Sequence, residues 1–203
     1  MKHIKTLGLL AVAVMALAAV FGTASASAAK FTAGKVGAAI EETTLKNHVF
    51  TITGSNTECT NISYTGATEA LESESQMVTP SYSGCTAFGF AATITNTNCT
   101  YTLTANKTVH IQSTGGGTCS LTIRVNNVFA QCDVTVGVQN GLASVTYTNG
   151  AGDLVVVVNI SKISAKVNES SGLCPLTVGS HTTASYTGES TVKAAGTTIA
   201  WDA

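Results

Sequence analysis

Residues 99–125 read CTYTLTANKTVHIQSTGGGTCSLTIRV, and three times within them apolar side chains or cysteines recur at every second position. In 99–103, 109–111 and 119–125 these residues share one parity, while mostly hydroxyl and other polar side chains take the other. Such alternation is typical of strands that bury one face. Asn106-Lys107 and the glycines at 115–117 interrupt it and predict turns. The segment therefore predicts three neighbouring strands of an antiparallel sheet.

The same alternation continues on both sides of this segment. Residues 132–138 and 163–167 repeat it toward the C-terminus, and 48–52, 78–82 and 182–186 show it elsewhere. Strands thus recur about every eight to twelve residues, which favours a sandwich or barrel over parallel β-α-β units. We predict an all-β protein, an antiparallel β-sandwich or barrel-like sheet of about 10–12 strands.

Turn signals and one exception complete this prediction. The pairs Asn140-Gly141 and Asn149-Gly150 predict two-residue hairpin turns. Only Thr68–Met77, TEALESESQM, has a pattern that favours a short helix. No Gly/Ser run or charge block divides the chain after its leader, so residues 29–203 are expected to form a single domain.

Residues 1–28 have the parts of a secretory signal peptide. Lys2 and Lys5 give a basic start, 7–21 is an apolar run, and 24–29, ASASAA, offers an A-x-A cleavage site. The apolar run is shorter than an ordinary membrane span. We expect a secreted, extracellular protein, free or associated with the cell envelope, with no stable membrane span once the leader is removed.

Six cysteines in an exported chain predict three disulfides. They are Cys59, Cys85, Cys99, Cys119, Cys132 and Cys174. A hairpin through residues 126–131 would place Cys132 opposite Val125. Cys119 would then be about 20 Å away, which is too far for a bridge.

A second hairpin favours a different partner for Cys119. The chain that leaves Cys99 turns at Asn106 and returns near Ser113, and the glycine-rich loop can carry Cys119 back to Cys99. We therefore predict the pairs Cys99 with Cys119, Cys59 with Cys85, and Cys132 with Cys174.

Cationic residues are few and scattered. The chain has 10 Lys and Arg against 11 Asp and Glu, and two of the lysines leave with the leader. Phosphate binding needs several cations on one surface, so we expect no nucleic-acid partner. Thr and Ser make up about a quarter of the chain and keep the surface polar without charge.

No cluster of residues indicates catalysis, a cofactor or a metal ion. His48, His110 and His181 are far apart in the sequence, and no C-x-x-C pair accompanies them. A G-x-S-x-G motif is absent, and we interpret the acidic group in 69–74 as a solvated face. We expect no catalytic, cofactor-binding or metal-binding residue, and a protein that is not an enzyme.

These observations favour a secreted or surface-associated, non-enzymatic β-sandwich that acts as a binding or structural module. Its ligand is unknown, and a cell-surface or glycan ligand fits this class, although Trp201 is the only tryptophan. Two alternatives stay open. One is an extracellular hydrolase with an unrecognised site. The other is a pore-forming or membrane-active secreted protein, because such hairpins alternate apolar and polar residues.

Several short motifs carry a resemblance. They are FTAGK (31–35), TPSYSGCTAFG (79–89), VTYTN (145–149) and Cys174-Pro175. Together they resemble an uncharacterised family of small secreted, cysteine-containing, β-rich proteins of soil actinobacteria, over most of the chain that follows the leader. The resemblance implies a secreted, disulfide-bonded, β-rich protein and assigns no functional residue.

Overall fold

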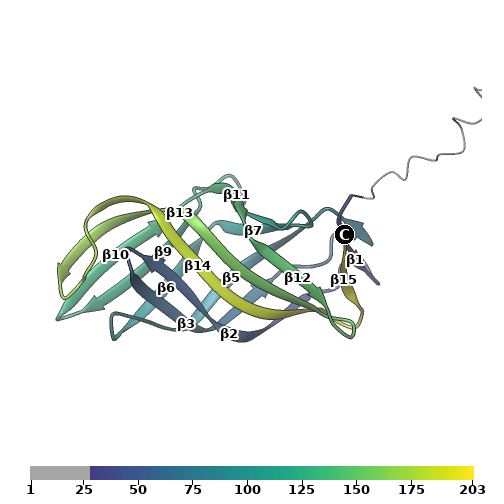
Figure 1. Cartoon of the computed structure of the whole chain (residues 1–203), viewed down its shortest axis with the longest axis horizontal. Coiled ribbons are helices and arrows are strands. Elements are labelled where there is room, and N and C mark those ends of the chain that lie inside the picture. The colour runs from purple at the N-terminus through teal and green to yellow at the C-terminus, as the bar shows by residue number, and fades with distance from the viewer. Residues whose placement is uncertain (1–27) are drawn as a thin grey trace, which may run out of the picture.

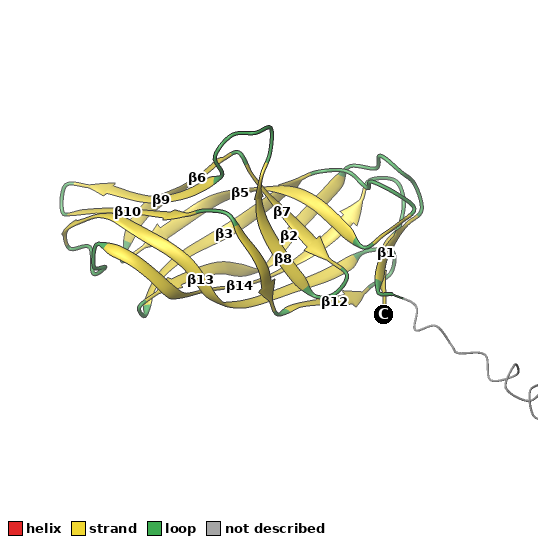
Figure 2. Cartoon of the chain, turned by 90° about the horizontal axis from the view of Figure 1, so that it is seen from above, coloured by secondary structure: helices red, strands yellow, loops and turns green. Residues whose placement is uncertain are grey.

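The computed structural model describes residues 28–203, which form an all-β protein (Figures 1 and 2). These residues contain no helix. The antiparallel, all-β fold with three disulfides is confirmed, in its barrel-like form. The predicted signal peptide lies outside the described residues, apart from its last position.

The described chain has fifteen strands, twelve in a main sheet and three in a small one. They are β1 (Lys30–Ala33), β2 (Ile40–Ile52), β3 (Ser55–Thr65), β4 (Glu72–Ser73), β5 (Ser75–Ala87), β6 (Phe90–Thr97), β7 (Cys99–Thr104), β8 (Thr108–Ser113), β9 (Ser120–Asn127), β10 (Ala130–Val136), β11 (Gln139–Ala143), β12 (Val145–Asn149), β13 (Leu154–Gly172), β14 (Gly179–Ala194) and β15 (Ile199–Asp202).

Eight strands of the main sheet close into an antiparallel barrel. Their order is β5-β3-β2-β14-β13-β10-β9-β6, and β6 pairs again with the last residues of β5. Closure leaves this part of the sheet without an open edge. The interior of an eight-stranded barrel is just wide enough for its own side chains or for one small ligand.

The long strands β5 and β13 each change partners along their length. Ser75–Val78 of β5 pairs with β7, whereas Cys85–Ala87 pairs with β6. Likewise, Leu154–Val158 of β13 pairs with β12, whereas Lys166–Gly172 pairs with β10. The barrel therefore continues past β6, β9 and β10 as a second wall of β7, β8, β11 and β12, which gives the elongated shape in Figure 1.

An amide side chain replaces strand pairing between β11 and β13. Gln139 Nε2 donates to the Ser164 carbonyl at 3.0 Å, and the Ser164 N–H donates to Gln139 Oε1 at 2.7 Å. A neighbouring strand would offer the same donor and acceptor. Gln139 thereby links the second wall to β13, at a residue where β13 also departs from regular pairing with β14.

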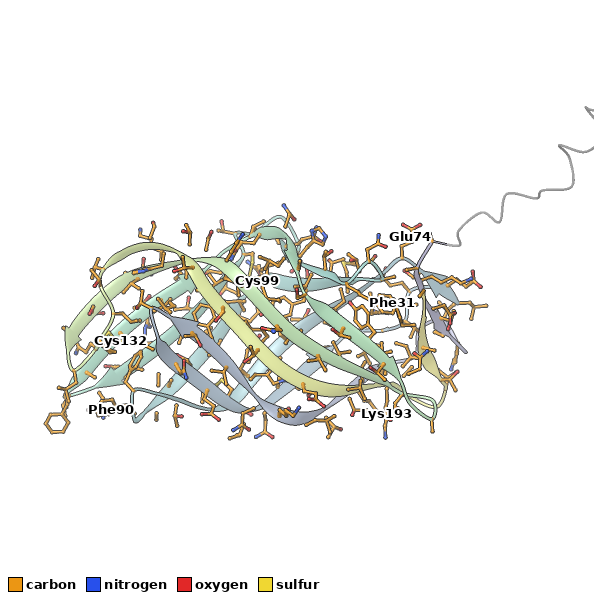
Figure 3. The ribbon with its side chains drawn as sticks, in the orientation of Figure 1. Phe31, Glu74, Phe90, Cys99, Cys132 and Lys193 are labelled. Atoms are coloured by element: carbon orange, nitrogen blue, oxygen red, sulfur yellow. A yellow bond between two sulfur atoms is a disulfide. The ribbon has the colours of Figure 1, made fainter. Side chains whose placement is uncertain are left out.

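The small sheet, in the order β15-β1-β4, covers the end of the barrel where the C-terminus lies (Figure 1). Phe31 packs edge to face on Tyr147, with ring centroids 5.0 Å apart, and Trp201 Nε1 donates to the Ala105 carbonyl at 2.9 Å. Figure 3 shows Phe31 at this end, and Phe90 and Cys132 toward the opposite end, which we call the distal end.

Burial alternates along the strands as the sequence predicts. β9 buries Leu121, Ile123 and Val125, and the residues between them are half-buried or exposed. One large apolar cluster fills most of the barrel, and a small cluster that includes Ala87 and Cys132 lies toward the distal end. Burial of these side chains provides most of the driving force for folding.

The short helix favoured over Thr68–Met77 is not present, and this prediction is wrong. The segment contains β4 and the start of β5. Thr68 Oγ1 accepts from the Ala38 N–H at 3.0 Å and donates to the Lys35 carbonyl at 2.6 Å. Because these bonds reach a distant part of the chain, tertiary contacts override the weak local preference for a helix.

Neither predicted two-residue Asn-Gly turn is present. β12 and β13 do form a hairpin at Asn149, but Asn149 pairs with Leu154 and the loop has four residues, 150–153, in which the Gly150 N–H donates to the Asp153 carbonyl at 2.9 Å. Asn140 and Gly141, by contrast, lie inside β11 at a shift of pairing register, and Gly141 has φ +65°. They form a bulge because β11 pairs with β8 and not with β10.

Candidate functional site

All three predicted disulfides are present. The Cα atoms are 4.0 Å apart in Cys59–Cys85, 4.6 Å in Cys99–Cys119 and 5.7 Å in Cys132–Cys174. Cys132 lies opposite Val125, and Cys99 lies opposite Ser113, so the hairpin registers used for the prediction are confirmed. The cysteines are structural, and no free cysteine occurs in residues 28–203.

The distal end of the barrel exposes large apolar side chains. Val128 is 89% exposed, and Phe129 and Leu173 are each 65% exposed. We call these three residues the apolar end. Phe90, the partly buried first residue of β6, lies toward the same end (Figure 3) and packs against the small cluster that includes Cys132. Single exposed apolar residues are ordinary, but a group gathered on adjacent turns marks an interaction surface.

Hydrogen bonds fix the two loops of the apolar end against each other. Asn127 Oδ1 accepts from the Phe129 N–H at 3.0 Å, which shapes the β9–β10 turn. The Phe129 carbonyl accepts from the Leu173 N–H at 2.8 Å. The disulfide between Cys132, in β10, and Cys174, the residue after Leu173, links the same two segments. The apolar side chains therefore stand on turns that are held in place.

The apolar end is uncharged. Residues 126–131 and 171–174, which carry its side chains, contain no Asp, Glu, Lys or Arg, and neither does the β5–β6 connection at 87–90. The nearest ion pair joins Arg124 to Asp133 at 2.5 Å, and Arg124 is thus already neutralised. An anionic surface would find no free cation here, so attraction to this end must come from apolar contact.

A second feature lies inside the barrel, where polar side chains form a hydrogen-bonded chain. The hydroxyls of Tyr101 and Tyr82 are 2.7 Å apart, and those of Tyr82 and Tyr186 are 3.4 Å apart. Tyr186 Oη lies 2.6 Å from His48 Nδ1, and His48 Nε2 lies 3.0 Å from Ser190 Oγ. We call this series the interior chain.

The interior chain continues toward Glu42. Thr44 Oγ1 donates to Glu42 Oε1 at 3.3 Å, and Ser190 also contacts the carboxyl. Burial raises the pKa of Glu42 more than these two hydrogen bonds lower it. Glu42 Oε2 is buried and has no hydrogen-bond partner among residues 28–203. A carboxyl group thus ends the chain with one oxygen still free to bind.

Burial keeps the groups of the interior chain neutral. It lowers the pKa of His48 to about 4, so the imidazole is uncharged near neutral pH. It raises the pKa values of Tyr82, Tyr101 and Tyr186 well above the ordinary phenol range. Each tyrosine therefore keeps its proton and can both donate and accept a hydrogen bond.

A cavity of about 60 Å³ adjoins the interior chain. Aliphatic side chains form most of its wall, and Phe50 and four tyrosines complete it: Tyr64, Tyr82, Tyr101 and Tyr186. Tyr64 is only 8% exposed, and its hydroxyl makes no hydrogen bond within residues 28–203. The cavity thus joins an apolar wall to hydroxyl groups that have unused hydrogen-bonding capacity.

The other titratable groups singled out in the sequence do not converge. His110 Nδ1 lies 3.2 Å from Asn140 Oδ1, and His181 Nε2 lies 2.8 Å from the Thr177 carbonyl. Glu72 pairs with Lys30 at 2.9 Å. Within residues 28–203, no group of three His, Cys, Asp or Glu is arranged to hold a metal ion. The same residues include no helix long and apolar enough to cross a membrane.

The sequence analysis predicted neither the apolar end nor the interior chain, although each left a signal in the sequence. Val128 and Phe129 are two adjacent apolar residues in a turn between alternating strands, a place where polar residues are usual. Glu42 and His48 share their parity with the buried Phe50. A polar residue with inward parity signals a buried partner, and Ser190 and Tyr186 of β14 provide it.

Comparison with known proteins adds no relative: no family model, no curated protein and no solved structure matches this chain. The class of protein is therefore defined by its fold, its exposed apolar end and its interior chain alone. The chain is a disulfide-bonded, antiparallel β-barrel with an uncharged apolar end and a polar chain in its interior.

Proposed function

We propose that the protein is a secreted, non-enzymatic binding module that attaches reversibly to the lipid surface of a cell envelope through its apolar end. The observation that carries this proposal is the exposure of Val128, Phe129 and Leu173 together on uncharged turns. The signal peptide predicted over residues 1–28 and the three disulfides support export.

The shape and charge of the apolar end favour a lipid surface over other partners. Its side chains stand on turns at one tip of the elongated barrel (Figure 1). Protruding apolar groups can enter the boundary between headgroups and acyl chains without a complementary protein pocket. The absence of charge on the turns matches an uncharged or zwitterionic lipid layer.

The expected affinity follows from the area that these side chains would bury. A fully buried Val, Leu or Phe contributes about 1.5–3 kcal/mol. Three partly exposed residues would therefore contribute about 4–6 kcal/mol, which corresponds to dissociation constants of about 0.04–1 mM. Attachment through this end alone is reversible.

Co-sedimentation of the mature protein with phosphatidylcholine vesicles tests the proposal. We expect Phe129→Ser to weaken binding about 10-fold, because a large apolar side chain is lost. Val138→Ser removes an exposed apolar side chain outside the apolar end and should leave binding unchanged. Binding should also persist in 1 M salt, since no cation takes part.

Three outcomes would overturn the proposal. One is equal vesicle binding by Phe129→Ser and the unchanged protein. Another is concentration-dependent dimerisation that Phe129→Ser abolishes, because the apolar end would then bind a second copy of this chain. The third is retention on insoluble glycans, with loss in Phe129→Ser and no vesicle binding, which would identify a sugar ligand.

A further inference from the structure

The interior of the barrel holds a second candidate site, which does not depend on the apolar end. We propose that the 60 Å³ cavity binds a small, mainly apolar molecule with one hydroxyl group, a short-chain alcohol, whose oxygen hydrogen-bonds to Tyr64 and to the interior chain at Tyr101. The inference rests on three observations: the size of the cavity, the unpartnered hydroxyl of Tyr64, and the open end of the interior chain.

The cavity size sets the size of the ligand. A cavity of about 150 Å³ in an apolar core accepts benzene, whereas one water needs about 10–15 Å³. A cavity of about 60 Å³ lies between these limits. It suits a molecule of a few heavy atoms, and its largely aliphatic wall, which includes Leu103 and Ile163, favours a molecule with an alkyl part.

The hydroxyl of Tyr64 is the first polar group available to such a ligand. Tyr64 is nine-tenths buried, lines the cavity and makes no hydrogen bond within residues 28–203. Its phenol oxygen therefore has an unused donor and an unused acceptor. A bound molecule with its own hydroxyl could hydrogen-bond to it, and a purely apolar molecule could not.

Tyr101 is the second polar group. It ends the interior chain and bonds only to Tyr82 within the described residues, although a phenol can make three hydrogen bonds. Tyr64 and Tyr101 both line the cavity. In the proposed complex the ligand oxygen therefore lies between these two hydroxyls, donating to one and accepting from the other.

The interior chain holds the Tyr101 end in place. His48, anchored between Tyr186 and Ser190, fixes one end of the series of hydroxyls, and Tyr82 bridges to Tyr101. The ligand would thus meet a preorganised hydroxyl, and less ordering would be needed on binding.

The proposal can be tested by titrating the mature protein with 2-propanol. The readout is the change in NMR chemical shift of the Ile, Leu and Val methyl groups that line the cavity. Xenon serves as a probe of similar size without a hydroxyl. We expect both to give saturable shifts confined to the cavity methyls. Tyr64→Phe should weaken 2-propanol binding about 5-fold, because one hydrogen bond is lost. It should leave xenon binding unchanged.

Two further variants keep the test decisive. Tyr147→Phe removes a buried hydroxyl that bonds to the Thr104 carbonyl, away from this cavity, and should change neither probe. Val109→Ile fills part of the cavity and should weaken the binding of both probes. This variant provides a test if Tyr64→Phe does not fold.

The proposal is overturned if 2-propanol gives no saturable shift at the cavity methyls, which would mean that water alone occupies the hydroxyls. Equal 2-propanol affinity in Tyr64→Phe and the unchanged protein would overturn it too. Neither result bears on vesicle binding by Phe129, so this inference and the proposed function can fail separately.

Discussion

The imidazole of His48 lies directly against the backbone of Gly188. A Cβ atom added at Gly188 would come within 3.0 Å of three atoms of the ring. Gly188 lies on β14, at a shift in pairing register with β2, the strand that carries His48. The absence of a side chain at Gly188 therefore makes the space in which His48 reaches Tyr186 and Ser190.

Replacing Gly188 should destabilise the barrel. In Gly188→Ala the new methyl displaces the imidazole, which strains the core and breaks its hydrogen bonds to Tyr186 and Ser190. We expect the free energy of unfolding in urea to fall by about 2–3 kcal/mol. Gly137→Ala is the matched control, because its methyl would meet only the Cys119 carbonyl oxygen, at 3.9 Å. An equal loss in both variants would contradict the role of the His48 contact.

Stability should depend on pH through His48. Its pKa is about 4 in the folded protein and about 6.5 when unfolded. The unfolded state therefore binds more protons between these values, and the free energy of unfolding falls as the pH drops from 6.5 to 4, by about 3 kcal/mol. Above pH 6.5 the contribution of His48 is constant.

A glutamine at position 48 tests this dependence. His48→Gln offers an amide to Tyr186 and Ser190 but cannot titrate, so its unfolding free energy should change less between pH 6.5 and 4. Glu42 acts in the opposite direction in both proteins, because a raised pKa gives stability that is lost as the pH rises. Parallel pH profiles for the two proteins, measured by urea unfolding, would refute the assignment to His48.

Local pattern was sufficient to predict the all-β fold, many of its strands and the hairpin registers behind the disulfide prediction. The parity of Cys119 through Val125 fixed which face of β9 is buried, and the turn after Val125 fixed the register that places Cys132. These are short-range properties, because alternation and turn length are read within a few residues.

Long-range pairing could not be predicted in the same way. Alternation shows which face of a strand is buried but not which strand lies beside it, so the change of partners along β5 and β13 left no signal in the sequence. The same reason explains the error at Asn140-Gly141, where a hairpin signal forms a bulge. The interior polar residues were not predicted as a group because their partners are far away in the sequence: His48 bonds to Tyr186 and Ser190 of β14.

The disulfide at the distal end should matter for binding as well as for stability. Cys132–Cys174 spans 42 residues of sequence, and a loop of that length contributes about 4 kcal/mol in the chain-entropy model. We expect the double variant Cys132→Ser/Cys174→Ser to unfold at a lower urea concentration. We also expect it to bind vesicles more weakly, because the two loops of the apolar end become mobile.

The disulfide between Cys99 and Cys119 provides the comparison. It spans 20 residues and contributes about 3 kcal/mol on the same model. The double variant Cys99→Ser/Cys119→Ser should therefore lose similar stability but keep its vesicle binding below the unfolding transition. Equal vesicle binding by the two double variants would show that the loops need no disulfide to present Phe129.

Gln139 gives a prediction about how the second wall is held to β13. Gln139→Ala removes both the donor to the Ser164 carbonyl and the acceptor for its N–H. We expect a loss of about 1 kcal/mol and faster hydrogen exchange at the Ser164 amide. Gln139→Glu keeps an acceptor for that N–H, so exchange at Ser164 should remain slow while the bond to the carbonyl is lost. Slow hydrogen exchange at the Ser164 amide in Gln139→Ala would mean that another group protects this amide. The Gln139 side chain would then not replace the hydrogen bonds of a neighbouring strand.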